Sequence, residues 1–153
     1  MNILDSGNIN TLIVGGLFMG IIFLLSFIKN MESRRLRRKL GVGRILLSGF
    51  NVHYYGLESD ERVPFKCMGV LGLSGEGLYF CSRILKRELF IKGEKFTSIS
   101  VTDDFNGKDM YGNVVVFNFI NDKDTQEKAA FRIPYPEKWS KAITDLFLKK
   151  NIV

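Results

Sequence analysis

The segment "TLIVGGLFMGIIFLLSFI", residues 11–28, determines the first feature of the fold, and the basic segment "KNMESRRLRRKLG", residues 29–41, follows it directly. Residues 11–28 carry no charge, and twelve of them are Leu, Ile, Val or Phe. A helix of this length is roughly 27 Å long, which is close to the hydrocarbon thickness of a bilayer. Its composition favours insertion by several kcal/mol. We therefore predict a transmembrane helix over residues 11–28.

A buried core helix and a cleaved signal peptide are the alternatives for such a segment. A signal peptide needs a basic region before the apolar run and a small-x-small cleavage site after it. The residues before the run carry Asp5 and no Lys or Arg, and "KNMESRR" follows it. Both features favour a membrane span over a cleaved peptide.

The charge on the two flanks predicts the orientation of the span. Residues 29–44 hold seven Lys or Arg and one acid, Glu32, and basic residues accumulate on the cytoplasmic side of a membrane helix. We expect residues 1–10 to lie outside the cell and residues 29–44 to form a basic juxtamembrane linker. Residues 45–153 would then form a cytoplasmic domain at the inner (plasma) membrane.

The basic residues beside the span are candidates for contact with anionic lipid headgroups, or they serve to set topology alone. The net charge of the whole chain is +6, which equals the net charge of residues 29–44, so positive and negative charges cancel over the rest of the chain. A nucleic-acid-binding surface would spread positive charge over the fold, so we expect no nucleic-acid partner. The candidate lipid-contacting residues are Lys29, Arg34, Arg35, Arg37, Arg38 and Lys39.

Two glycines four residues apart, Gly16 and Gly20, lie within the apolar segment. Small residues at this spacing make a groove that another helix can approach closely. We expect the span to pack against a second copy or against other membrane subunits. The alternative is that the spacing of the two glycines is coincidental and that this face contacts lipid.

From residue 45 onward, short runs of alternating apolar and polar residues are separated by Gly, Asn and Asp, which is typical of β-strands. We predict seven short antiparallel strands, with a bulge at Gly49. In residues 95–103 we expect Thr97, Ile99 and Val101 to point inward. The predicted strands lie in residues 44–56, 65–82 (two strands joined by a turn at 74–77), 87–92, 95–103, 112–122 and 128–134.

One helix is predicted after the strands, in "PEKWSKAITDLFLKKN", residues 136–151. Pro136 suits the first helical position, and Glu137 lies where the helix dipole favours an acid. One apolar stripe, which can cap the open end of a small barrel, comprises Trp139, Ala142, Ile143, Leu146 and Phe147. The fold class is thus one transmembrane α-helix and an α+β domain, a seven-stranded antiparallel β-barrel or sandwich capped by a C-terminal helix.

The order of "ILLSGFNVHYYG", "GVLGLSGEGLYF", "ELFIKGEKFTSISV", "VVVFNF" and "AAFRIPYPEKWSKAI" resembles the GRAM or bacterial pleckstrin-homology-like (PH-like) family. The resemblance covers roughly residues 43–149. It is carried by the opening strand, the hairpin before "GLYF" and the final helix with its tryptophan. It implies a PH-like domain without enzymatic activity that binds lipid headgroups, peptides or partner proteins.

The loop between the first two predicted strands departs from the basic motif of phosphoinositide-binding PH domains. It reads "GLESDERVP" and sets three acids against Arg62, so it would repel a polyphosphorylated headgroup. The acids Glu58, Asp60 and Glu61 are candidates for docking a partner protein instead.

Residues that suit catalysis or metal binding do not form a recognisable set in the sequence. His53 is the single histidine, so no second histidine completes a metal site with it. Cys67 and Cys81 would be offset by several positions in the predicted hairpin, which is too far for a disulfide. "DDFNGKDMYGN", residues 103–113, lacks the spacing of a calcium loop. We expect no enzyme, no cofactor, no metal and no small-molecule substrate.

Two functions remain open on this sequence. The chain is either an accessory or scaffolding subunit of a membrane protein complex, or a membrane-tethered lipid- or signal-sensing adaptor. The first predicts a protein partner in fixed stoichiometry. The second predicts dependence on lipid composition and on salt. We favour the first, because a fixed span makes recruitment by lipid unnecessary.

Overall fold

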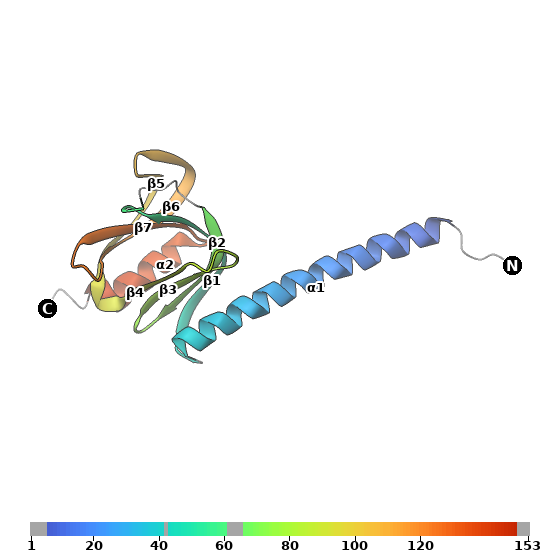
Figure 1. Cartoon of the computed structure of the whole chain (residues 1–153), viewed down its shortest axis with the longest axis horizontal. Coiled ribbons are helices and arrows are strands. Elements are labelled where there is room, and N and C mark those ends of the chain that lie inside the picture. The colour runs from blue at the N-terminus through green and yellow to red at the C-terminus, as the bar shows by residue number, and fades with distance from the viewer. Residues whose placement is uncertain (1–5, 42, 61–65, 150–153) are drawn as a thin grey trace.

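The computed structural model describes residues 6–41, 43–60 and 66–149, and consists of a long N-terminal helix joined to a sheet domain (Figure 1). The helix α1 spans Ser6–Leu40 without a break. Within its Thr11–Leu40 part, the most apolar window has a mean hydropathy of 2.5 and none of it is buried. By length and composition α1 can therefore cross a membrane.

Seven antiparallel strands follow α1, as the sequence predicts. They form one sheet in the order β4-β3-β2-β1-β7-β6-β5. The turn between β2 and β3 and the irregular pairing of β1 after Gly49 are also confirmed. The strands are β1 (Ile45–Leu57), β2 (Cys67–Ser74), β3 (Gly77–Ser82), β4 (Glu88–Lys92), β5 (Phe96–Phe105), β6 (Lys108–Ile120) and β7 (Gln126–Arg132).

The sheet folds over on itself along β1, which pairs with β2 on one side and with β7 on the other. Register shifts after Gly49 and after Tyr54 let β1 bend between the two halves. Rings from the two halves meet in the core, where the centroids of Phe80 and Phe131 lie 5.4 Å apart. The domain is thus a sandwich-like barrel with one main apolar core.

The C-terminal helix α2 (Pro136–Ile143) covers this core, and its stripe is confirmed, because Trp139 and Ile143 are buried. The α-helix ends sooner than predicted, since a π-helical segment, η2 (Thr144–Leu148), continues it. Phe147 in η2 stacks on Phe96 with a centroid separation of 5.6 Å.

The predicted orientation of β5 is wrong in part. Phe96, expected to point outward, is buried, whereas Thr97 and Val101 are exposed and Ile99 packs against the core. The pairing with β6 shifts between Phe96 and Ser98. Because this shift adds a residue to β5, Phe96 and Ile99 point to the same side of the sheet.

Candidate functional site

The C-terminal third of α1 packs on the outer face of β2 and β3, and the apolar centre of this contact is formed by Leu36 and Leu40. Both side chains are buried, against Val70 and Tyr79 among others. They lie four residues apart and so share one face of the helix. Gly72 supplies the space, because a Cβ there would lie 2.8 Å from Leu36 Cδ2 and 2.9 Å from Leu40 Cδ1. The predicted linker residues 29–40 are therefore helical and packed on the domain.

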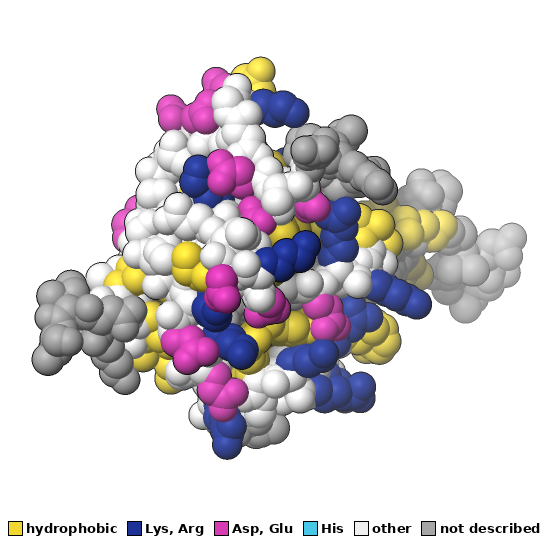
Figure 2. Space-filling model, turned by 60° about the vertical axis from the view of Figure 1, so that its left-hand side comes forward, with side chains coloured by type: hydrophobic (Ala, Val, Ile, Leu, Met, Phe, Trp, Pro, Cys, Tyr) yellow, Lys and Arg dark blue, Asp and Glu magenta, His cyan; other side chains and the backbone are white. Residues whose placement is uncertain are grey.

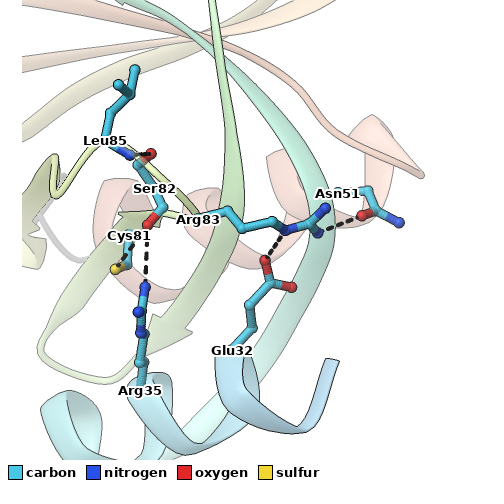
Figure 3. Close-up of polar contacts among 7 residues, drawn as sticks. All are labelled: Glu32, Arg35, Asn51, Cys81, Ser82, Arg83 and Leu85. Atoms are coloured by element: carbon cyan, nitrogen blue, oxygen red, sulfur yellow. Dashed lines mark hydrogen bonds and ion pairs between the residues drawn. The ribbon is translucent and has the colours of Figure 1, made fainter. Parts of the chain in front are cut away.

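A nearly buried ion pair joins α1 to the loop after β3 (Figure 3). Arg83 Nε donates to Glu32 Oε1 at 2.7 Å, and Arg83 Nη2 donates to Asn51 Oδ1, also at 2.7 Å. The Glu32 side chain is 5% exposed and that of Arg83 is 27% exposed. A carboxylate removed from water in this way depends on its partner, so the pair orients α1 on the domain.

Two further basic residues of α1 also contact the domain. Arg35 Nη1 donates to the main-chain oxygen of Ser82 at 3.4 Å (Figure 3). Lys39 Nζ lies 2.9 Å from Glu88 Oε2 and also stands over the ring of Tyr79. The hydrogen bond from Lys39 lowers the pKa of Glu88. Burial raises the pKa of the Tyr79 hydroxyl, which therefore stays neutral.

The loop between β3 and β4, residues 83–87, has a defined conformation. The main-chain nitrogen of Arg83 donates to Met68 O at 2.8 Å, and that of Ser82 donates to Arg87 O at 2.8 Å. Leu85 N donates to Ser82 Oγ at 3.1 Å. These bonds hold the loop with two apolar side chains outward, Ile84 at 83% exposure and Leu85 at 44%.

A groove of about 470 Å³ lies between α1 and this loop. We call it the collar groove. Figure 2 shows Lys and Arg side chains gathered on the side of the domain from which the apolar part of α1 recedes. The charged lining of the collar groove consists of one acid, Glu88, and five basic residues: Arg35, Arg38, Lys39, Arg83 and Lys86.

The order of contacts along α1 gives its direction relative to the domain. Leu40 and Glu76, in the β2–β3 turn, line the same small cavity. Arg35 reaches Ser82 at the far end of β3, and Glu32 reaches Arg83 beyond it. The apolar part of α1 therefore projects past the β3–β4 loop.

The structure separates the six predicted lipid-contacting residues into two groups. Lys29 stands 5.4 Å from the centre of the Phe50 ring, and Arg35 and Lys39 contact the domain as described above. The second group, Arg34, Arg37 and Arg38, is exposed and makes no ion pair with the part of the chain that the structure describes. Of the six residues, Lys39 alone is paired with a carboxylate among the described residues, and the second group makes none of these contacts with the domain.

The predicted helix-packing residues Gly16 and Gly20 lie on the exposed part of α1. A Cβ at either position would meet no described atom within 4 Å. This face is open within the chain, and its packing against another helix stays a prediction.

The predicted acidic docking loop is largely neutralised by the domain's own basic residues. Glu58 Oε1 lies 2.7 Å from Lys128 Nζ, and Asp60 Oδ2 lies 3.7 Å from Arg87 Nη1. Glu61 lies outside the described residues. Docking of a partner through these acids stays a prediction, but two of them do not present an unpaired charge.

The titratable residues of the strands do not assemble into a metal cluster within the described ranges. Cys67 and Cys81 are free and buried, and Cys81 pairs with Val70 across the hairpin, so the predicted offset between the two cysteines is confirmed. Burial lowers the pKa of His53, whose Nδ1 has no hydrogen-bond partner among the described residues. His53 alone would offer a metal ion a single ligand atom, and the described residues supply no further ligands beside it.

The sequence alone does not predict the roles of Asn51 and Gly72 in the junction, nor the pairing of Arg83 with Glu32. One signal was available, because Glu32, Leu36 and Leu40 recur at intervals of four within a strongly basic segment. Such a stripe indicates a packed helical face rather than a linker surrounded by solvent.

No family model matches the chain, and no curated protein matches it. Among the solved structures that are similar in fold, two each have a TM-score of 0.53. One, from the 8S snRNP assembly intermediate, is 9% identical, with 69% of this chain and 84% of that chain covered. The other, the C-terminal domain of an unknown protein from Leishmania infantum, is 16% identical, with 75% and 94% covered. At these identities the likeness concerns the fold alone.

Proposed function

We propose that this chain is a single-pass membrane protein without enzymatic activity, which acts as an accessory or scaffolding subunit of a membrane protein complex. The apolar part of α1 crosses the membrane with its N-terminus outside. The basic end of α1 and the sheet domain lie on the cytoplasmic side, as the excess of Lys and Arg after the apolar segment favours.

The observation that carries this proposal is the continuity of α1 with the sheet domain. One helix runs from the apolar segment to Leu40, and its end is packed through Leu36 and held by the Glu32–Arg83 pair. A flexible tether would let the domain search freely, whereas this junction holds it at one height and in one orientation. Fixed placement suits a subunit that contacts its partners both within the membrane and beside it.

A PH-like domain is the fold that we assign to residues 45–149. Seven antiparallel strands followed by a C-terminal helix are the elements that the resemblance implies. Domains of this kind present loops and strand edges to peptides and proteins. In this chain β4 and β5 are the edge strands of the sheet, so each has an unpaired side that an extended segment could join.

Within the membrane, the Gly16 and Gly20 face supports contact with a partner helix. Both positions are open in the chain, and small residues allow close approach of backbones. Gly16→Ile with Gly20→Ile tests this face. Gly15→Ile is the matched control, because it adds the same side chain at a neighbouring position that is equally open.

Purification of the native protein in a gentle detergent, with measurement of the mass and composition of the particle, tests the proposal. We expect a large particle of fixed stoichiometry that the double isoleucine variant disrupts and the Gly15→Ile variant preserves. A lone protomer or a homodimer would overturn the assignment as an accessory subunit.

The predicted orientation has its own test. A reporter enzyme fused after Val153 should be active in the cytoplasm, and activity on the outer side would contradict the topology.

The alternative function, a membrane-tethered lipid- or signal-sensing adaptor, is favoured by the collar groove and its excess of basic residues. It predicts that the domain's contact with the membrane depends on anionic lipid and weakens with salt.

A further inference from the structure

We propose that the collar groove binds the phosphate-bearing headgroup of an anionic membrane lipid, and that Ile84 and Leu85 enter the membrane interface beside it. This inference rests on the membrane anchorage proposed above, but not on the role as an accessory subunit. It adds a second, specific membrane contact to the one made by the apolar helix.

The height of the groove along α1 is the first argument. The apolar segment ends at Ile28, and Glu32 contacts Arg83 four residues later. At the rise of an α-helix, four residues advance about 6 Å. The headgroup layer extends roughly 5–7 Å beyond the hydrocarbon on each side of a bilayer. The β3–β4 loop therefore meets α1 at the depth of the lipid headgroups. Arg35 and Arg38 line the groove seven and ten residues after Ile28, which is about 10 and 15 Å along the helix, and helical side chains lean toward the N-terminus, here toward the headgroups.

The charge of the groove is the second argument. Lys39 is paired with Glu88, and Arg83 with Glu32. Arg35 donates one hydrogen bond to Ser82 O, and its other guanidinium N–H groups remain available to a ligand. Arg38 and Lys86 have no ion-pair partner among the described residues. Arginine donors match the oxygens of a phosphate, and a volume of about 470 Å³ accommodates a small headgroup.

The exposed apolar tip of the loop is the third argument. Ile84, at 83% exposure, stands beside Lys86, and the hydrogen bonds of Ser82, Arg83 and Leu85 prevent it from folding back. An aliphatic side chain held in water and flanked by basic residues is typical of a loop that enters a membrane surface.

The acids of the neighbouring β1–β2 loop do not oppose this contact as strongly as the sequence indicates. Asp60 is paired with Arg87 of the β3–β4 loop itself, and Glu58 with Lys128. The repulsion expected from these two carboxylates is therefore largely cancelled within the domain.

Lipid titration of the full chain tests the groove. The chain is held in a neutral detergent and titrated with phosphatidylglycerol or with phosphatidylcholine, and bound lipid is counted by native mass spectrometry. We expect a preference for phosphatidylglycerol. Arg38→Gln with Lys86→Gln should weaken its binding roughly a hundredfold, since each hydrogen bond from a charged donor to a phosphate oxygen contributes roughly tenfold.

Arg34→Gln with Arg37→Gln is the matched control, because it removes the same charge from exposed positions outside the groove. We expect the control to weaken binding by no more than about threefold, an allowance for general attraction. Equal losses in both double variants would overturn the groove as a specific site. Displacement of the lipid by inorganic phosphate at equal concentration would also overturn it, in favour of a soluble ligand.

Tryptophan quenching tests the entry of the loop. Ile84→Trp is placed in the full chain and reconstituted into nanodiscs whose lipids carry bromine on the upper acyl chain. Trp139 is 2% exposed in the domain core and serves as an unquenched internal reference. We expect strong quenching of the introduced tryptophan alone.

Two failures of this experiment are distinguishable. A chain that does not enter the nanodisc at all would overturn the membrane anchorage and this inference with it. A chain that enters the nanodisc but leaves the introduced tryptophan unquenched would overturn the loop contact and leave the proposed function intact.

Discussion

Truncation of one buried leucine should release α1 from the sheet domain. Leu36 is 1% exposed and fills the space above Gly72. Leu→Ala changes at such sites cost about 2–5 kcal/mol, and the lower half of this range applies because the junction can partly collapse around the gap. We therefore expect Leu36→Ala to weaken docking by about 2–3 kcal/mol.

Trypsin cleavage measures this docking directly, because five cleavage sites lie within residues 34–39 of α1. When opening is fast relative to cleavage, the cleavage rate follows the population of the undocked state. A loss of about 2–3 kcal/mol then accelerates cleavage roughly 30- to 150-fold. The sites are Arg34, Arg35, Arg37, Arg38 and Lys39.

The matched control is Leu46→Ala, since Leu46 is 57% exposed on β1 and lies away from the contact. The sheet domain should keep its thermal unfolding temperature in both variants, because Leu36 belongs to a cluster separate from the main core. Equal cleavage rates in the two variants would refute the reasoning. The basic segment would then be protected by the detergent or the membrane and not by packing on β2 and β3.

Three further predictions concern the junction and the sheet. Arg83→Gln should weaken docking by about 2–3 kcal/mol in the trypsin assay, because it leaves the Glu32 carboxylate buried without a cation, whereas Glu32→Gln removes that charge and should cost less. Acidification should loosen the junction, because Lys39 holds the pKa of Glu88 below its ordinary value of 4.5. The Lys39–Glu88 pair therefore stabilises docking fully above pH 4.5, and this stabilisation is lost as the pH falls through the pKa of Glu88 in the folded state. Spin-label distances between α1 and the domain should broaden below pH 4.5, and Glu88→Gln should remove this dependence. Gly69→Ala should destabilise the domain by about 3 kcal/mol in thermal unfolding, since its Cβ would lie 2.1 Å from Cys81 O, while Gly75→Ala, with open space around it, should not.

The elements that sequence could predict are those that local patterns dictate. The β2–β3 hairpin follows from its turn at residues 74–77, where Gly77 adopts a φ of 156°. The stripe of α2 follows from spacing alone, and Trp139 lies buried as expected. Both features depend on residues close together in the chain.

The junction could not be predicted in the same way, because its contacts join distant residues. Glu32 and Arg83 are separated by 51 positions, and in the sequence Glu32 is one acid among bases. A count of charges predicts that residues 29–41 are surrounded by solvent. Instead, the packing of Leu36 and Leu40 on Gly72 removes one face of this helical segment from water. The bulge in β5 escaped for a related reason, since alternation assumes that every residue in a strand is paired.

The fixed coupling between α1 and the sheet domain is the central claim, and a distance measurement in lipid tests it most directly. Spin labels at Arg34→Cys on α1 and Glu94→Cys before β5 occupy exposed positions, and the native cysteines are each 5% exposed. The full chain in nanodiscs should give one narrow distance distribution, which Leu36→Ala broadens. A broad distribution in the unaltered chain would contradict the account, because the domain would then hang from the helix on a flexible tether.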